Sequence, residues 1–229
     1  MKVELVSKTT GVGKYQDLNS EEIISAIARH GIIKEDGGKL VKYLMDNKHW
    51  SPLDMINFTF EIETSRAIGR QILRHSIKFQ EHSQRYSDRV LFEPIELRKE
   101  HPTNRQSSSE AFNPDLNWDL SPIKDNSFTT PVKANDWIDQ HLKSTEELYN
   151  KLIEAGVAKE CARMILPECT TTTISANGTL RSWLSFLNVR LDEHSQKEIR
   201  ELSSQIAECL ALELPNVFKT IDYKNGMFM

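Results

Sequence analysis

Residues 65–89 have the composition of an anion-binding segment. They contain five arginines and one lysine against two acidic residues, although the whole chain carries a net charge of −4. Arg66, Arg70 and Arg74 recur every four residues, so a helix over 65–75 would place them on one face. Like charges at this spacing repel one another. The pattern is explained by a bound anion, by carboxylates elsewhere in the chain, or by solvation of exposed arginines.

The residues that follow add hydrogen-bonding groups that suit a nucleotide. Within six positions the chain places donors, acceptors and a fixed cation, at Gln80, Glu81, Ser83 and Arg85. An arginine fork pairs well with phosphate, and a hydroxyl beside amide groups suits a phosphate or the edge of a pyrimidine. Ser83 has no evident histidine partner, and serine is a poor nucleophile without a base. We therefore interpret Ser83 as a binding residue.

A second candidate stretch covers 177–200 and places arginines beside an apolar helix face. The residues with helical spacing that form the expected core face are Leu180, Trp183, Leu184 and Leu187. That core face leaves Arg181 and Arg190 unexplained. We therefore treat both arginines as candidate functional residues.

Most of the elements that position these residues are predicted to be helices. Capping residues, apolar periodicity and breaking prolines predict helices over 20–30, 38–47, 65–75, 134–154, 158–165, 180–191 and 195–214. Ser20 and Ser65 are the expected N-caps of the first and third of these helices. Pro215 ends the last one.

One segment has the pattern of a strand with a single buried face. Apolar residues alternate with polar ones over 55–64, at Ile56, Phe58, Phe60 and Ile62. Residues 166–174 are rich in β-branched side chains and are also expected to be extended. Residues 97–131 are rich in Ser, Asn, Asp and Pro. They are expected to form a long, partly irregular connection, which is functional or contains short elements.

These elements predict an α+β fold, in which a small, mainly antiparallel sheet packs with several helices. The length of 229 residues suits one domain, or two small ones at most, and we predict a single domain over 1–229. The chain is 38% hydrophobic and 27% charged, which is typical of soluble globular proteins. No apolar run approaches the ~20 residues that a membrane-spanning helix needs, and the first residues lack the apolar core of a signal peptide. We therefore expect a cytoplasmic protein without a membrane partner.

Several other classes of site are disfavoured by the sequence. Cys161, Cys169 and Cys209 are scattered and odd in number, so we expect reduced thiols without disulfide or metal roles. The seven histidines show no metal-binding spacing. The run from Gly11 to Lys14 lacks the first glycine and the final hydroxyl residue of a phosphate-binding loop. The negative net charge argues against a nucleic-acid partner.

The segment 74–86 resembles the signature of flavin-dependent thymidylate synthases. That signature has the form R-H-R-x-x-S-x-N-E-x-S-x-R-Y, and this chain has R-H-S-I-K-F-Q-E-H-S-Q-R-Y. The second half of the motif matches at Glu81, Ser83, Arg85 and Tyr86, with Gln80 in place of Asn. The first half is one residue shorter. No second arginine follows His75, and Lys78 stands where the family often has Ser.

Three further stretches resemble the same family, in the same order along the chain. Residues 181–190 resemble its R-S-x-x-x-F-x-x-x-R helix, which is followed by H-x-Q-x-E-I. Residues 48–64 resemble its H-x-S-P-x-E-H motif, with Met55 where many members have a flavin-contacting His. Residues 158–167 resemble its E-x-A-R-x-x-L-P motif. Each match is weak alone, but four in the right order favour membership of the family.

The resemblance implies an activity, a set of cofactors and an assembly. It implies that dUMP is methylated with methylene-tetrahydrofolate as carbon donor, and that FAD reduced by NADPH carries the hydride. It also implies a homotetramer whose active sites are shared between subunits. Arg190 is the implied catalytic residue, because it would stabilise negative charge on the activated uracil.

The resemblance also implies two sets of binding residues. The dUMP set is Gln71, Arg74, Glu81, His82, Ser83, Gln84, Arg85, Arg163 and Arg190. The FAD set is Arg74, His75, Lys78, Gln80, Glu81, Thr179, Arg181, Ser185 and His194.

Two alternative functions stay open at this point. Because the second arginine of the signature is missing, a related enzyme that leaves a hydroxymethyl group on dUMP is one alternative. The other is a non-catalytic nucleotide-binding relative, which would bind dUMP without a flavin.

Overall fold

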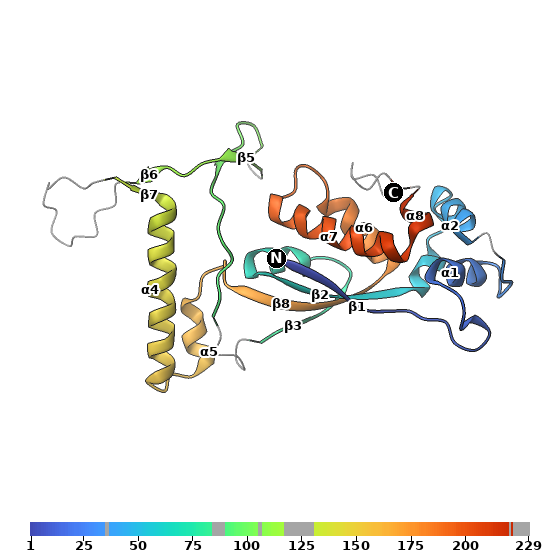
Figure 1. Ribbon diagram of the computed structural model, residues 1–229, viewed down its shortest axis with the longest axis horizontal. Helices are drawn as coiled ribbons and strands as arrows, with labels where there is room; N and C mark the ends of the chain where they lie inside the picture. The colour runs from blue at the N-terminus through green and yellow to red at the C-terminus, as the bar shows by residue number, and fades with distance from the viewer. Residues whose placement is uncertain (35–36, 84–89, 105–106, 117–130, 220, 222–229) are drawn as a thin grey trace, which may run out of the picture. The chain divides into compact units, whose positions relative to one another are not determined.

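The computed structural model describes the chain except for residues 35–36, 84–89, 105–106, 117–130, 220 and 222–229. The chain separates into two compact units (Figure 1). The first unit combines Met1–His82 with Thr172–Met229, and the second is Ser83–Thr171. The single catalytic domain over 1–229 therefore stays a prediction.

The first unit contains a four-stranded sheet with the strand order β1-β2-β8-β3. The strands are β1 (Lys2–Lys8), β2 (Asn57–Ser65), β8 (Thr171–Thr179) and β3 (Lys78–Glu81). The pairs β1–β2 and β3–β8 are both antiparallel. The helices gather around this small sheet, which confirms the predicted α+β class.

Strand β2 supplies the centre of the sheet and its predicted alternation is confirmed. Its inward residues Phe58, Phe60 and Ile62 are fully buried, whereas the residues between them are partly or largely exposed. The edge strands β1 and β3 were not predicted from the sequence. Both are mostly exposed. In β1 only Val3 and Leu5 alternate inward and pack partly against the core, and β3 is just four residues long.

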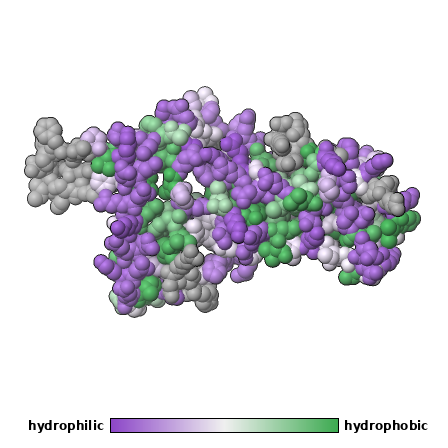
Figure 2. Space-filling model, in the orientation of Figure 1, coloured by the Kyte–Doolittle hydropathy of each residue, from purple (hydrophilic) through white to green (hydrophobic). Residues whose placement is uncertain are grey.

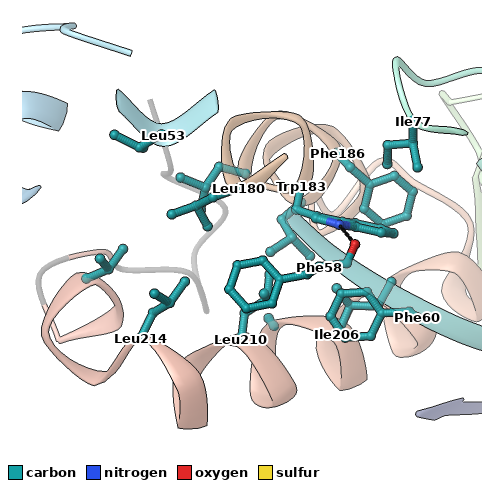
Figure 3. Packing of buried hydrophobic residues seen from close by; sticks show 14 of the residues in the cluster. Leu53, Phe58, Phe60, Ile77, Leu180, Trp183, Phe186, Ile206, Leu210 and Leu214 are labelled. Carbon is teal, nitrogen blue, oxygen red and sulfur yellow. Dashed lines mark hydrogen bonds between the residues drawn. The ribbon is translucent and has the colours of Figure 1, made fainter. Parts of the chain in front are cut away.

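The helices of the first unit have clear bounds. They are α1 (Ser20–Ala28), α2 (Gly37–Asp46), α3 (Arg66–Ile72), α6 (Leu180–Arg190), α7 (Lys197–Glu213) and α8 (Pro215–Phe218), with 3-10 turns at Gly13–Tyr15 and Ser51–Met55. Figure 3 shows how α6 and α7 enclose the aromatic residues of β2. Trp183 of α6 lies edge-on to Phe60, with the ring centroids 4.9 Å apart. Its indole N–H donates to the Phe58 carbonyl at 3.0 Å, so α6 is tied to the sheet.

A glycine allows this close packing between α6 and the sheet. A Cβ atom at Gly178 would lie 3.2 Å from both Ile77 and the indole nitrogen of Trp183. These distances are tighter than ordinary van der Waals contact. The glycine near the end of β8 therefore lets the strand pass directly beneath the tryptophan.

Most predicted helix boundaries are off by one or more residues, and three differences bear on how the helices begin or end. Asn19, not Ser20, is the N-cap of α1, because its side chain accepts from Glu22 N–H while the Glu22 carboxylate accepts from Asn19 N–H. Helix α7 begins at Lys197 rather than 195. Helix α3 ends at Ile72 rather than 75, because the chain turns there to bury Ile77 before β3. Arg74 therefore lies beyond the helix and does not continue its face.

The second unit is built around the long helix α4 (Ala134–Glu154). Helix α5 (Lys159–Ala162) continues as a 3-10 turn, Arg163–Ile165. A small apolar core forms where Val90, Tyr149 and Ala162 are buried. The visible face of α4 is mostly hydrophilic (Figure 2).

The predicted long connection over 97–131 contains short elements, which was one of the two expected outcomes. They are β4 (Arg98–Glu100), β5 (Ser108–Ala111) and β6 (Asp115–Leu116), and β6 pairs with β7 (Val132–Lys133). The expected extended segment 166–174 becomes strand only from Thr171 and then runs on to Thr179. A turn closed by Thr170 N–H and the Pro167 carbonyl precedes the strand. Every helix in the described part of the chain is too short or too polar to span a membrane.

Candidate functional site

Helix α6 carries an arginine near each end and is held firmly between them. It starts where the Thr179 hydroxyl accepts from the Ser182 N–H at 3.2 Å, a side-chain cap. Trp183 and the neighbouring apolar residues anchor its inner face in the core. Arg181 therefore lies in the first turn and Arg190 is the last residue, and both are presented by a rigid element.

Arg190 is held by two acceptors that carry no charge. Its Nε–H donates to Nε2 of His75 at 2.8 Å, and Nη2 donates to the Gln71 carbonyl at 3.0 Å. The Gln71 side chain is occupied elsewhere, because its amide donates to Gln196 at 2.8 Å. Arg190 is half-buried, and this burial together with the nearby Arg74 lowers its pKa. Arginine stays protonated despite such a shift, so the site retains a positive charge.

His75 is a neutral imidazole in this arrangement. Burial, followed by the positive charges of Arg190 and Arg74, lowers its pKa to about 4. Its ring packs edge-on against Phe186, with centroids 4.8 Å apart and planes at 71°. Because Nε2 accepts a hydrogen bond, the proton of the neutral ring is assigned to Nδ1. The sequence resemblance placed His75 in the FAD set, and the structure places it against Arg190 as well.

A pocket of about 410 Å³ opens beside this pair. Its lining comes from three parts of the first unit: the Ser51–Met55 turn, the segment after α3, and the first half of α6. The lining residues are Asp54, Arg74, His75, Ser76, Arg181, Ser182 and Ser185. Four residues of the predicted FAD set therefore share one pocket, namely Arg74, His75, Arg181 and Ser185.

Sequence reasoning missed three residues of this pocket, Ser76, Ser182 and Asp54, of which Asp54 is the charged one. Its Oδ2 pairs with Nη1 of Arg181 at 3.2 Å, and its Oδ1 accepts from the Thr179 hydroxyl at 3.1 Å. Thr179 therefore has a visible role, in the cap of α6 and in holding Asp54. The sequence contained a usable signal, because Asp54 stands at the acidic position of the H-x-S-P-x-E-H-like motif.

Lys78, Gln80 and Glu81 of the signature lie on strand β3 and do not line this pocket. Lys78 and Gln80 are exposed on the edge strand, where they pair in register with Asn177 and Ser175 of β8. The Glu81 carboxylate accepts from the Thr172 hydroxyl at 2.8 Å. The next residue, His82, is exposed and continues the ladder through its backbone N–H.

Among the described residues of the first unit, His194 does not line this pocket. His194 is exposed in the α6–α7 connection, and its Nδ1 lies 2.8 Å from Asp192 Oδ1. Ser83 and Arg163 belong to the second unit, where Arg163 opens the 3-10 turn. Gln84 and Arg85 lie outside the described residues. The predicted roles of these five residues stay predictions. No group of three potential metal ligands gathers among the residues that the structure describes.

Comparison with known families matches residues 8–216 to the family described as Thymidylate synthase complementing protein. The chain belongs to this family. A relative named "Probable flavin-dependent thymidylate synthase" from Paramecium bursaria Chlorella virus 1 is 35% identical over 97% of this chain and 100% of its own length. A flavin-dependent thymidylate synthase from Synechocystis is 34% identical over 91% of this chain and 92% of its own. One from Dictyostelium discoideum is 33% identical over 76% of this chain and 54% of its own.

Membership of the thymidylate synthase complementing protein family confirms the resemblance drawn from the motifs, and with it the enzyme class. The names of the relatives imply a flavin, which is an anionic cofactor when it is a dinucleotide. The pocket suits such a group, because its lining has two positive charges, from Arg74 and Arg181, and one negative charge, from Asp54. Three serine hydroxyls add hydrogen-bonding capacity. One of them belongs to Ser76, which follows His75 directly because the second arginine of the signature is missing.

Proposed function

We propose that this chain methylates dUMP to dTMP, with methylene-tetrahydrofolate as the carbon donor and FAD reduced by NADPH as the hydride carrier. The proposal is supported by family membership, by names of relatives that span nearly all of the chain, and by the pocket beside Arg190. The observation that carries it is the state of Arg190, a half-buried guanidinium whose visible partners are both neutral.

Arg190 has the property that this reaction requires. Attack on the carbon donor by carbon 5 of uracil requires negative charge to build up in the pyrimidine ring and its oxygens. A preorganised cation that keeps its charge stabilises such a transition state strongly in a partly desolvated site. The two neutral partners of Arg190, His75 and the Gln71 carbonyl, support its proposed role as the catalytic electrostatic residue.

The binding roles divide between the described elements. In the first unit, Arg74, Arg181, Ser185 and His75 would hold FAD, together with Thr179 through its contact with Asp54. Lys78, Gln80 and Glu81 on β3, and His194 after α6, complete the proposed FAD set. When bound, reduced FAD supplies the hydride that completes the methyl group; the protein binds, orients and polarises.

The proposed dUMP set extends beyond the pocket. It includes Gln71, Arg74, Glu81 and His82 of the first unit, Ser83 and Arg163 of the second, and the undescribed Gln84 and Arg85. We further propose a homotetramer with shared active sites and a cytoplasmic location. Exposed functional side chains on β3 are compatible with a site completed by another subunit.

The deciding experiment is spectroscopic and chemical. The visible absorbance spectrum of the purified protein is recorded, and dUMP, methylene-tetrahydrofolate and NADPH are then added without oxygen. We expect a flavin spectrum that bleaches with NADPH, and dTMP among the products. A colourless protein that takes up no added FAD yet binds dUMP would contradict the proposal and favour a non-catalytic nucleotide-binding relative.

The hydroxymethyl-forming alternative keeps one observation in its favour. Ser76, not an arginine, lines the pocket after His75, so the flavin side of the site has one cation fewer than the family signature provides. Weaker flavin binding would impair hydride delivery. Mass analysis of the nucleotide product distinguishes the outcomes, because a hydroxymethyl product is one oxygen heavier than dTMP.

A further inference from the structure

The contact between His75 and Arg190 joins two segments that are 115 residues apart in sequence. His75 lies in the turn after α3, and Arg190 ends α6. The Nε–Nε2 distance of 2.8 Å is short for an N–H to N hydrogen bond, as expected when the donor is charged. The contact therefore ties the end of α6 to the turn after α3.

The two bonds determine which N–H groups of Arg190 are left for a ligand. A guanidinium has five N–H donors in one plane. One is used by His75 and one by the Gln71 carbonyl. Within the part of the chain that the structure describes, both N–H groups of Nη1 and the second N–H of Nη2 are left, and their direction is set because the plane is held at two points.

The His75 ring is itself fixed by its neighbours, so it can fix the orientation of the Arg190 guanidinium. Its ring rests edge-on against the fully buried Phe186, one turn before Arg190 on the same helix. The neighbouring arginines disfavour a second proton on the ring, so Nε2 is kept as an acceptor. A carboxylate in the same place would also hold Arg190, but it would neutralise the charge, as Asp54 does for Arg181.

We propose that His75 is a positioning residue for Arg190: its neutral ring and the Gln71 carbonyl orient the guanidinium toward the uracil of dUMP without cancelling its charge. This inference rests on the proposed function, since it takes dUMP as the ligand of Arg190. It differs from the flavin role that the family resemblance implied for His75, because the effect on dUMP passes through Arg190.

Three substitutions separate orientation from charge. His75→Gln places a neutral amide oxygen near the position of Nε2, His75→Leu removes the acceptor, and His75→Glu supplies a charged one. We expect His75→Gln to bind dUMP within about threefold of the wild type. His75→Leu should weaken binding about tenfold or more, the usual range for a hydrogen bond to a charged group. His75→Glu should preserve binding better than His75→Leu and yet lower kcat more than KM rises, because the cation is neutralised.

A double-mutant cycle tests whether the effect passes through Arg190. Calorimetric titration with dUMP is performed on the purified holoprotein for wild type, His75→Leu, Arg190→Ala and the double variant, with flavin content measured for each. We expect His75→Leu to change dUMP affinity by less than about twofold once Arg190 is gone. Additive effects that track flavin loss would overturn the proposal, because His75 would then act on the flavin alone.

A measurement that does not need dUMP separates the positioning role of His75 from the proposed function. Nitrogen-15 NMR of the histidine rings at pH 7, assigned by loss of one signal in His75→Gln, reports the tautomer of His75. We expect a neutral ring protonated on Nδ1. A ring protonated on Nε2 would overturn the positioning role, whether or not dUMP binds. If the expected tautomer is seen but the wild-type protein binds no dUMP, the proposed function itself is overturned, and the positioning role for dUMP with it.

Discussion

Helix α6 has an arginine near each end, and the two arginines differ in the charge of their partners. Arg181 at the start is about half exposed and paired with the carboxylate of Asp54. Arg190 at the end is half-buried and bonded to the neutral ring of His75 and to a backbone carbonyl. The first arginine is satisfied by an opposite charge, whereas the second is oriented without being neutralised.

This difference indicates that the two arginines do different work. An exposed ion pair contributes little to stability and is weakened by salt, so Arg181 is free to exchange its partner for an incoming anion. A partly buried cation with neutral acceptors has already lost some hydration and gains most when negative charge develops nearby. The start of the helix is therefore suited to binding an anionic cofactor, and its end to stabilising a reaction.

Removal of Arg190 should have the largest effect of these substitutions, and the effect should be on kcat. Arg190→Ala should lower kcat by about 100- to 1,000-fold, the range seen when one preorganised electrostatic donor is lost. Arg190→Lys, which keeps the charge but not the two oriented bonds, should recover only part of that loss. Steady-state kinetics of dTMP formation measures both. A kcat within about threefold of wild type for Arg190→Ala would end the catalytic assignment.

Trp183 ties helix α6 to the sheet, so its loss should affect stability before it affects either arginine selectively. Trp183→Phe deletes the bond to the buried Phe58 carbonyl and should cost about 1–3 kcal/mol in the free energy of unfolding. Urea denaturation gives the value. If flavin binding or dUMP binding alone is lost while stability is unchanged, the tryptophan does not hold the helix as described.

Substitutions at the start of α6 should have a smaller effect, and that effect should appear in FAD binding. Arg181→Ala should lower FAD affinity about tenfold, while unfolding free energy changes by less than about 1 kcal/mol, as for an exposed ion pair. Asp54→Asn is the matched partner variant. It removes a negative charge from the pocket and should raise FAD affinity by up to about threefold at low salt. Equilibrium titration with FAD decides the matter; a fall in affinity for Asp54→Asn would mean that Asp54 chiefly orients Arg181.

The smallest expected effect is a pH dependence of stability, caused by His75 near the Arg190 end of α6. The pKa of His75 is lowered to about 4 in the folded protein, while the unfolded chain takes up this proton near the ordinary histidine value of 6.5. Since the unfolded state then binds more protons between those values, stability falls as pH drops through this window. Arg190 and Arg74 act on the ring directly, and Asp54 and Arg181 share the pocket with it.

The thermal midpoint should therefore fall between about pH 6.5 and pH 4, and His75→Gln should show a shallower decline. Differential scanning calorimetry of both proteins across that range makes the comparison. Identical slopes would show that His75 is not the group responsible.

The regular elements were predictable where one face is strongly buried. The alternation of β2 and the bounds of α4 and α6 follow from local patterns that burial reinforces. The edge strands β1 and β3 were missed because the alternation of β1 is short, at Val3 and Leu5, and β3 has only four residues. Helix α3 ended early because tertiary burial of Ile77 outweighed helical spacing.

The sequence by itself determined the family, the α+β class and the candidate arginines, because motif order and apolar periodicity are properties of the chain read in one dimension. Only the tertiary structure decided which partners those arginines have. Asp54 meets Arg181 across 127 residues, and His75 meets Arg190 across 115. The neutral state of the His75 ring depends on burial and on neighbouring cations, which exist only once the chain has folded.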